Sequence, residues 1–533
     1  MTTNVPGRAR WGVASPHPAA TDAAVTVLEA GGTAVDGAIA AAGVLTVVYP
    51  HNCSIGGDLI ALVRRPGEQP KAVLGVGRSA GAIDVDGLRR TFGERMPAYG
   101  PFSISVPGVV SGWQAMHELG GRRPLGELLE PAVEFAADGT AVSPSLARAL
   151  EELETSDPGM TDLFGLAGER LGPGDVFAQP RLAGTLAQVA ADPDSYYRGV
   201  LARRLVAGLE AAGSPITLED FARHRAVVTA SLVTDAGALA PRLFTPGLPS
   251  QGPFFAALAA LVGTLLAKGH DLTGRDAGLL ARAFGEISRI RDDLLSDPSR
   301  SPGDARIGGR LAEVDLFGPA PPPGRIDQRV TRRPARPGGD TVAVVTFDSS
   351  GGSVSLLQSV FHSFGSRVLD PDTGVLFHNR QSMFTLRRGV PSELGPGLMP
   401  PHTLCPTMVD TVDGEASRVL ATMGGRGQPQ ILAQTLLQLA TGKSAADAVG
   451  APRFIVGDTE RGGSQHVATA EADVPEAAVA SLAQDGFDVR LVSERNEEMG
   501  HAQLLCIGEE GAVDGGADPR SDGVSRTGAI GPT

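Results

Sequence analysis

An aspartate–threonine pair, Asp340-Thr341, stands at an abrupt change in the sequence. It follows a segment rich in proline, glycine and arginine (331–339) and opens a run typical of a β-strand (341–348). If the chain is cut before Thr341, this residue carries a hydroxyl and a free α-amine, a nucleophile with its own base. An α-amine titrates near ~8, so a useful fraction is neutral at physiological pH. The pair therefore predicts a nucleophile made by cleavage, and an ordinary turn before a strand is the alternative.

The residues after Thr341 predict a hairpin that would hold it. A Ser-Ser-Gly-Gly turn (349–352) connects the first strand to a second one (353–360). Ser359 lies on the second strand, and an in-register hairpin would place it beside Thr341 as a hydrogen-bond partner. A serine that merely faces solvent is the alternative for Ser359.

The segment 341–367 resembles the nucleophile region of the γ-glutamyltransferase family, which belongs to the N-terminal nucleophile hydrolases. The family pattern is a threonine that opens a strand, a D-x-x-G-x-x-V-S hairpin starting here at Asp348, and an F-G-S motif starting at Phe364. Further matches in the family's order cover nearly the whole chain: Ser15-Pro16-His17-Pro18, Gly31-Gly32-Thr33-Ala34-Val35-Asp36-Gly37, Pro50-His51, Ile55-Gly56-Gly57-Asp58, Val106-Pro107-Gly108, Pro131-Ala132, Cys405-Pro406-Thr407-Met408, Met423-Gly424-Gly425, Ala451-Pro452-Arg453-Phe454 and Ala517-Asp518-Pro519-Arg520.

The resemblance implies an α/β (α+β) fold, a four-layer αββα sandwich, in which the two cleavage products form one unit. The large subunit would be 1–340, with an exposed pre-cleavage segment at 297–340, and the small subunit would be 341–533. Cleavage would begin with attack of the Thr341 hydroxyl on the Asp340 carbonyl, followed by hydrolysis of the resulting ester. The freed amine would then act as general base, and water or an amine acceptor would resolve an acyl-enzyme.

Two further positions match the family's catalytic and binding residues. Gly424 and Gly425 correspond to the backbone oxyanion hole, where glycine lets N–H groups approach a tetrahedral oxygen. A plain turn between a strand and a helix is the alternative. Arg78 falls where the family has an arginine that grips the substrate α-carboxylate with two parallel hydrogen bonds. A surface arginine is the alternative there.

Other positions depart from the family and bear on the substrate. Met383 stands where γ-glutamyl-specific members have an aspartate that holds the α-ammonium group, and a methionine cannot bind a cation by charge. His402 and Thr403 replace a serine pair that helps to hold the carboxylate, and Arg380 adds a positive charge. These changes favour an acyl group without a free α-ammonium group, or one held differently. His402 and His378 are open to a second interpretation as structural histidines.

Three hypotheses of function follow. The first is amide hydrolysis or acyl transfer on a γ-glutamyl or related compound such as glutathione. The second keeps the machinery but changes the bond, as in acylases of cephalosporin side chains or C–C bond hydrolases of antibiotic pathways. The third is an uncleaved, inactive scaffold that binds a ligand, and retention of Thr341 and the glycine pair argues against it.

Composition narrows the classes of protein that remain possible. The chain has 533 residues, of which 42% are hydrophobic and 20% charged, as in a globular enzyme. Its net charge of −14, spread along the chain, argues against nucleic-acid binding. The three cysteines have no metal-ligand spacing, and no phosphate-binding loop is present, so we expect no metal and no cofactor.

The N-terminal residues lack the apolar core of a secretory signal, which predicts a cytoplasmic protein. The longest apolar run (38–48) is too short to cross a bilayer and predicts a buried helix, so no membrane contact is expected.

Periodicity predicts the main elements. Two helices are expected near the N-terminus, at 19–30 and 35–48. The section from 125 to 294 is expected to be mainly helical. After Thr341 strands should dominate, apart from a helix at 429–440. The stretch 297–339 is expected to be long, irregular and exposed.

Overall fold

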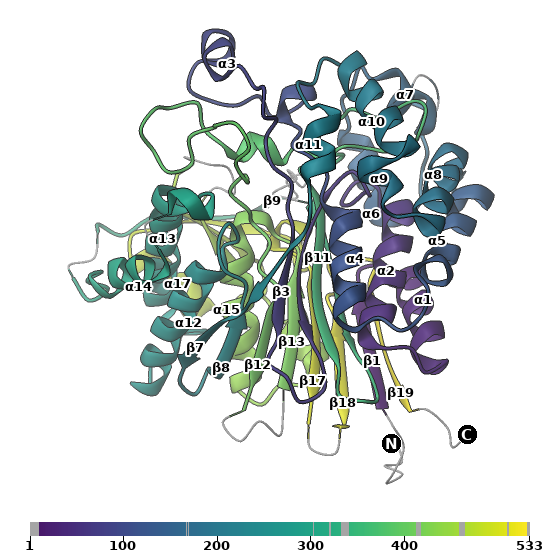
Figure 1. The fold of residues 1–533 in the computed structure, drawn as a ribbon. Coiled ribbons are helices and arrows are strands. Elements are labelled where there is room, and N and C mark those ends of the chain that lie inside the picture. Colours follow the sequence, from purple (N-terminus) through teal and green to yellow (C-terminus); the bar gives the residue numbers. More distant parts are fainter. Residues whose placement is uncertain are drawn as a thin grey trace.

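Two antiparallel β-sheets, stacked face to face, form the centre of the molecule (Figure 1). The computed structural model describes residues 10–166, 168, 170–301, 303–318, 321–331, 340–411, 417–457, 464–508 and 511–529. Apolar side chains fill the space between the sheets, including Ala343 and Val345 from one sheet and Leu505 and Ile507 from the other. The proline- and arginine-rich residues 332–339 lie outside the described part.

In the described chain, the first sheet has seven strands in the order β19-β1-β10-β11-β2-β3-β6. Their bounds are β1 (Arg10–Ser15), β2 (Asp58–Arg64), β3 (Lys71–Gly75), β6 (Val227–Ala230), β10 (Asp340–Phe347), β11 (Ser353–Phe361) and β19 (Val524–Ala529). The second sheet has six strands in the order β18-β17-β13-β12-β8-β7. Their bounds are β7 (Leu232–Ala236), β8 (Ala240–Thr245), β12 (Thr407–Asp410), β13 (Ser417–Thr422), β17 (Ala502–Ile507) and β18 (Val513–Ala517). Segments on both sides of Thr341 contribute strands to both sheets.

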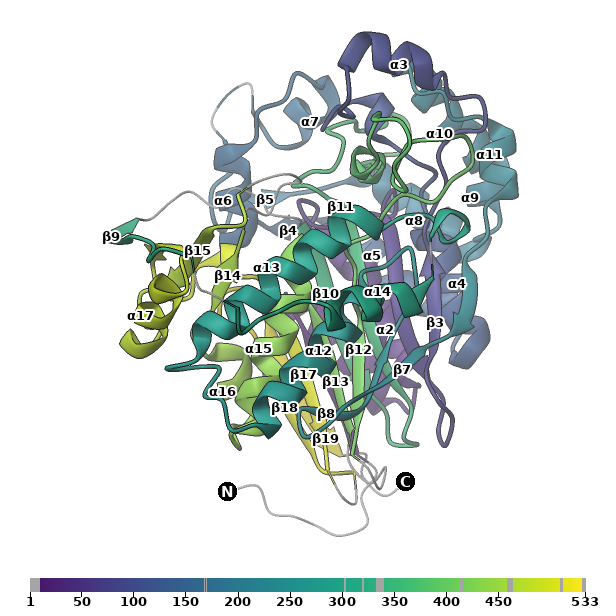
Figure 2. The same cartoon turned by 90° about the vertical axis from the view of Figure 1, so that its left-hand side faces the viewer.

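Helices cover the outer face of each sheet (Figures 1 and 2). The first sheet packs against a layer that includes α1 (Pro18–Glu29), α2 (Ala34–Val48), α4 (Val109–Gly120), α5 (Leu125–Asp138) and α8 (Pro180–Ala191). The second packs against a layer that includes α12 (Gly252–Ala267), α13 (Ala277–Leu294), α14 (Asp304–Ala312), α15 (Gln428–Ala440), α16 (Ala445–Gly450) and α17 (Glu476–Gln484). The predicted four-layer αββα sandwich is confirmed.

Smaller elements surround these layers. The other helices are α3 (Val85–Phe92), α6 (Pro144–Glu152), α7 (Pro158–Leu163), α9 (Ser195–Arg198), α10 (Val200–Ala211) and α11 (Leu218–Arg223). The remaining strands are β4 (Thr140–Ala141), β5 (Val176–Phe177), β9 (Ile326–Thr331), β14 (Phe454–Val456), β15 (Val467–Glu471) and β16 (Asp488–Val492). Short 3₁₀ turns are η1 (Pro101–Ser103), η2 (Pro298–Arg300), η3 (Arg380–Met383), η4 (Gly425–Gly427) and η5 (Glu497–Met499).

The predicted hairpin is present and is fixed at its turn by one carboxylate. Asp348 Oδ1 accepts hydrogen bonds from the backbone N–H of Ser350 at 2.8 Å and of Gly352 at 3.1 Å. Its Oδ2 accepts from Ala34 N at 2.8 Å, at the first turn of the fully buried helix α2. Because Asp348 ties this turn to α2, it fixes β10 relative to the helical layer.

Two sequence predictions about elements were incomplete. The section 125–294 is mainly helical, as predicted, but it also contains the strands β4 to β8, which were not predicted. Of these, β6 and β7 are rich in valine and threonine and form edge strands of the two sheets. The stretch 297–339 was expected to be irregular and exposed. Its described residues are mostly exposed, as expected, but they are not irregular, because they contain α14 and β9. Ile307 and Leu311 of α14 are buried in the core of the second sheet's helices, which makes α14 part of this layer. Helices α16 and α17 were also not expected after Thr341.

No helix within the described residues is long and apolar enough to cross a membrane.

We predict that Asp348→Ala lowers the free energy of unfolding by about 2–3 kcal/mol, because it leaves the buried N–H groups of Ala34 and Gly352 without their acceptor. Equilibrium urea unfolding measures this change. Ser350→Ala is the matched control, since it removes only the hydroxyl that donates to Asp348 Oδ1, and should cost about 1 kcal/mol or less. Equal effects of the two substitutions would contradict the role assigned to the carboxylate.

Candidate active site

Thr341 lies at the head of the central strand β10 and is buried, with 2% of its surface exposed. Its register partner on β11 is Ser359. The Thr341 hydroxyl donates a hydrogen bond to Ser359 Oγ at 3.1 Å. Because alternate residues of a strand share a face, the Thr341 side chain points toward the space between the sheets, as Ala343 and Val345 do. The predicted placement of Ser359 beside Thr341 is therefore confirmed.

The pairing of β10 with β11 is irregular at the bond predicted to be cut. Thr341 pairs with Ser359, but Asp340 pairs with Phe361, so Val360 is an extra residue on β11. Phe361 has a φ of 79°, which is rare for a bulky side chain. Bulges of this kind redirect side chains next to active sites. The ladder is thus interrupted between Asp340 and Thr341.

Arg380 connects the nucleophile candidate to the rest of the site. Its Nη2 donates to Ser359 Oγ at 3.2 Å and its Nη1 to Thr403 Oγ1 at 3.0 Å. Its Nε donates to Asp58 Oδ2 at 2.9 Å. The guanidinium lies over the Phe361 ring, 4.3 Å from its centroid. Arg380 is completely buried, so the partners named above hold its positive charge inside the protein.

Asp58 is the anion of this buried cluster. In addition to Arg380, its Oδ2 lies 3.0 Å from His378 Nδ1 and 3.1 Å from His402 Nε2. All four side chains have 0% exposure. Burial alone would raise the pKa of Asp58, but the neighbouring His378 and His402 hold it well below its usual range. Asp58 is therefore a carboxylate.

His402 is neutral in this arrangement. Burial and then the Arg380 charge lower its pKa to about 4. Leu404 N donates to its Nδ1 at 3.4 Å, so the ring proton resides on Nε2 and is donated to Asp58. His402 therefore positions Asp58 without adding charge.

The glycine pair has a backbone conformation that favours glycine at both positions. Gly424 and Gly425 have φ values of 139° and 51°, which favour glycine, and they lead into η4. A Cβ on Gly424 would lie 2.4 Å from Ile431 Cδ1. Among the hydrogen bonds of the described residues, neither glycine N–H donates to a protein group, as is usual at the start of a helical turn. Their role as oxyanion donors stays a prediction.

Gln251 ties this glycine turn to Thr403. It is buried, and its Nε2 donates to the Gly425 carbonyl at 2.8 Å and to the Thr403 carbonyl at 2.5 Å. β13, which ends just before the glycine pair, packs against β10 across the sheet interface. Gln251 therefore holds two of the predicted site elements in one arrangement.

Two predicted residues are not among the hydrogen-bonded partners described above. Arg78 is half-exposed, donates to the Gly397 carbonyl at 2.9 Å and lies 3.6 Å from Asp297 Oδ2. Its role as a carboxylate anchor stays a prediction. Met383 is buried in the apolar core beside the second sheet, so an apolar group does occupy this position.

Sequence reasoning missed the importance of Asp58, His378 and Gln251. One signal was present: two glycines directly precede Asp58 at the start of a strand. A Cβ on Gly57 would lie 2.4 Å from the Ser359 carbonyl oxygen, so only glycine allows this turn to approach β11. His378 and Gln251 carry no such signal, because their partners lie far away in the sequence.

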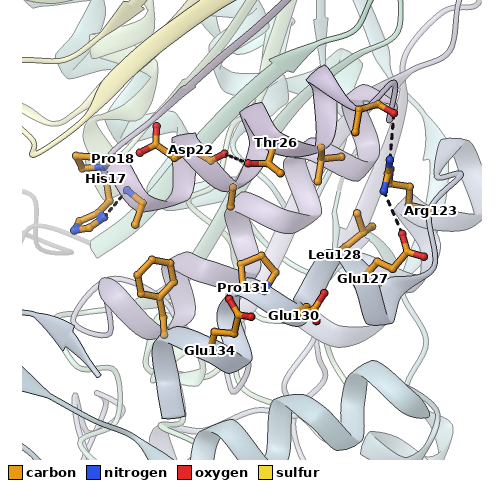
Figure 3. Close-up of a pocket in the computed structure, with 15 residues that line it drawn as sticks. His17, Pro18, Asp22, Thr26, Arg123, Glu127, Leu128, Glu130, Pro131 and Glu134 are labelled. Atoms are coloured by element: carbon orange, nitrogen blue, oxygen red, sulfur yellow. Dashed lines mark hydrogen bonds and ion pairs between the residues drawn. The ribbon is translucent and has the colours of Figure 1, made fainter. Parts of the chain in front are cut away.

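A separate groove of about 760 Å³ lies between α1 and α5 (Figure 3). Its lining includes the acidic residues Asp22, Glu127, Glu130 and Glu134, with Arg123 paired to Glu127 at 3.2 Å. None of its lining residues belongs to the cluster around Thr341, so it is a different surface feature.

A threonine heads a central strand of an αββα sandwich, beside a serine hydroxyl that a buried arginine also contacts. This fold and site define an N-terminal nucleophile hydrolase. The family model of gamma-glutamyltranspeptidase matches residues 20–527. The chain belongs to the γ-glutamyltranspeptidase family, and it is an enzyme of the glutathione hydrolase-like type.

Relatives of this chain differ in their named activities. It is 35% identical to an oxamate amidohydrolase proenzyme of Klebsiella pneumoniae, over 96% of this chain and 97% of the relative. It is 32% identical to the glutathione hydrolase-like YwrD proenzyme of Bacillus subtilis, over 96% and 97% of the two chains. Among solved structures, a cephalosporin acylase from Bacillus halodurans is 26% identical, with a TM-score of 0.84 and coverage of 99% and 97%.

Acid should destabilise the fold through its buried histidines. Burial is the main cause that lowers the pKa values of His224, His362 and His402 to about 4, whereas an unfolded histidine titrates near ~6.5. Between these values the unfolded chain binds more protons than the folded chain. Stability therefore falls as pH drops from about 6.5 toward 4, by up to about 1.4 kcal/mol per pH unit for each group.

Urea midpoints at pH 7, 6 and 5 measure this dependence. His402→Gln is the matched variant, since it keeps a neutral donor near Asp58 but removes one titrating group. Between pH 7 and pH 5, the variant should lose less stability than the unsubstituted protein. A midpoint that does not change with pH would show that these histidines titrate alike in both states.

Proposed function

We propose that this protein cuts itself between Asp340 and Thr341 and then hydrolyses a small amide whose acyl group carries a carboxylate next to the reacting carbonyl. The observation that carries the proposal is the position of Arg380. This buried guanidinium is hydrogen-bonded to Ser359, and Ser359 is hydrogen-bonded to the Thr341 hydroxyl.

Self-cleavage would use the Thr341 hydroxyl as the attacking group. Its oxygen adds to the Asp340 carbonyl carbon, the C–N bond breaks, and the nitrogen takes up a proton to become an amine. Water then hydrolyses the ester, which gives an Asp340 carboxylate and restores the Thr341 hydroxyl. The products would be the large subunit 1–340 and the small subunit 341–533. Since both contribute strands to both sheets, we expect them to stay associated.

Turnover would use the same hydroxyl with the new α-amine. The amine accepts the hydroxyl proton as Thr341 attacks the substrate carbonyl, and the N–H groups of Gly424 and Gly425 stabilise the oxyanion. Ammonia or an amine leaves with a proton, and water hydrolyses the acyl-enzyme. Thr341 is 2% exposed and Arg380 is 0% exposed in the uncut chain, so substrate would enter after cleavage.

Arg380 would anchor the substrate carboxylate. A guanidinium has five N–H groups, and three of them donate to Asp58, Thr403 and Ser359. The two others can bind a carboxylate that lies close to Thr341. In oxamate the carboxylate carbon is bonded directly to the amide carbon, so such a compound fits this short separation. The 35% identity to an oxamate amidohydrolase supports the same substrate class.

Met383 argues against a γ-glutamyl substrate. A buried methionine among apolar neighbours leaves the α-ammonium group without an anion at this position. Loss of a buried charge partner typically costs about 2–5 kcal/mol. The second candidate is an acylase that takes an uncharged apolar acyl group, which the apolar Met383 and the 26% identity to a cephalosporin acylase favour.

Ammonia release from oxamate by the purified protein tests the proposal. We expect turnover of oxamate, little release of nitroaniline from γ-glutamyl p-nitroanilide, and neither activity in Thr341→Ala. Arg380→Gln should raise the KM for oxamate about 100-fold or more, since it removes the carboxylate anchor.

The outcomes separate the candidates. Good turnover of γ-glutamyl p-nitroanilide with none of oxamate would overturn the proposed substrate class. Hydrolysis of a cephalosporin side-chain amide with no hydrolysis of oxamate would favour the acylase. Self-cleaved protein that retained oxamate turnover after Arg380→Gln would exclude Arg380 as the anchor.

A further inference from the structure

His378 has a hydrogen-bond acceptor at each ring nitrogen. Its Nδ1 lies 3.0 Å from Asp58 Oδ2, and its Nε2 lies 2.9 Å from the backbone carbonyl of Ser105. A carboxylate and a carbonyl can only accept hydrogen bonds, so the two contacts require a proton on each of the two ring nitrogens. The Ser105 hydroxyl lies farther from Nε2, at 3.4 Å. A lone pair on Nε2 would face the closer carbonyl oxygen, which is unfavourable in a fully buried site.

The charges around His378 do not cancel if both nitrogens carry protons. Asp58 contributes one negative charge and Arg380 one positive charge. His402 is neutral, and the nearby His224 is neutral as well, because burial lowers its pKa to about 4. A protonated His378 then leaves one positive charge uncompensated among side chains with 0% exposure. Such a charge is costly in a protein interior unless an anion joins it.

We propose that His378 is held as an imidazolium, and that the resulting excess positive charge selects substrates with a negative charge beside the reacting carbonyl. This inference rests on the proposed function, since the anion that completes the cluster is the substrate carboxylate on Arg380. His378 acts as a positioning residue through Asp58 and Arg380. The same excess charge repels an α-ammonium group, which adds a second reason, besides Met383, for the loss of γ-glutamyl specificity.

A pair of near-isosteric substrates tests the selection. Oxamate and its neutral diamide, oxamide, differ in that an amide replaces the carboxylate. We expect the unsubstituted enzyme to prefer oxamate in kcat/KM, and His378→Gln, which cannot be charged, to lower this preference about 10- to 100-fold, mainly through the KM of oxamate. A preference that His378→Gln leaves unchanged would overturn the proposal.

His402→Gln is the matched control. It also replaces an imidazole on Asp58 Oδ2, but His402 is neutral, so the charge of the cluster does not change. The oxamate preference should therefore persist in His402→Gln, whatever the change in rate. Equal loss of preference in the two variants would show that packing around Asp58, and not charge, sets the specificity, and would overturn the proposal.

A spectroscopic measurement tests His378 without reference to activity. In uncut Thr341→Ala protein labelled with ¹⁵N-histidine, the two ring nitrogens of His378 should have the nearly equal shifts of an imidazolium at pH 7, with the signal assigned by its loss in His378→Gln. The unequal shifts of a neutral ring would overturn the inference. If the enzyme turns over neither oxamate nor oxamide, the proposed substrate class fails, and the ¹⁵N shifts still decide the charge of His378.

Discussion

One buried carboxylate, Asp58, organises the site around the nucleophile. Three donors from distant parts of the chain, His378, Arg380 and His402, converge on its Oδ2. Without this anion Arg380 would be an unpaired cation in the protein interior, a situation that costs several kcal/mol. Since Arg380 in turn binds Ser359 and Thr403, the positions of both hydroxyls depend on Asp58. The fold supplies this anion at the first residue of β2, directly beside β11.

The strand pairing and the buried cluster perform different tasks. Pairing of β10 with β11 sets Thr341 opposite Ser359, and the extra residue Val360 on β11 interrupts the ladder between Asp340 and Thr341. The cluster supplies charge, and the glycine turn held by Gln251 supplies backbone donors. In the proposed mechanism, the same threonine is first the residue that attacks its own chain and then the residue that attacks substrate. This requires the geometry to be complete before cleavage, and the uncut chain already has the Thr341–Ser359 and Ser359–Arg380 contacts.

The sequence was most informative where the signals are local. The Thr341 hairpin, the buried helix α2 and the long helices follow from periodicity and turn residues, and the structure has them within a few residues of the predicted bounds. The edge strand β6 was missed because its identity depends on pairing with β3, which is distant in the sequence. β7 and β8 form a local hairpin, which was missed because the whole section was interpreted as mainly helical. His378 was weighed only as an isolated histidine, since its contact with Asp58 spans 320 positions. Arg380 was identified as an added positive charge, but its partners were not predictable without the packed structure.

The central claim is that Thr341 becomes an N-terminal nucleophile, and intact mass under denaturing conditions tests it most directly. We predict two fragments from the unsubstituted protein, with the smaller one beginning at Thr341 by N-terminal sequencing. Thr341→Ala should give a single full-length species, while Thr341→Ser, which keeps a hydroxyl, should still be cut. A full-length unsubstituted chain, or a Thr341→Ala chain cut at the same bond, would contradict the claim.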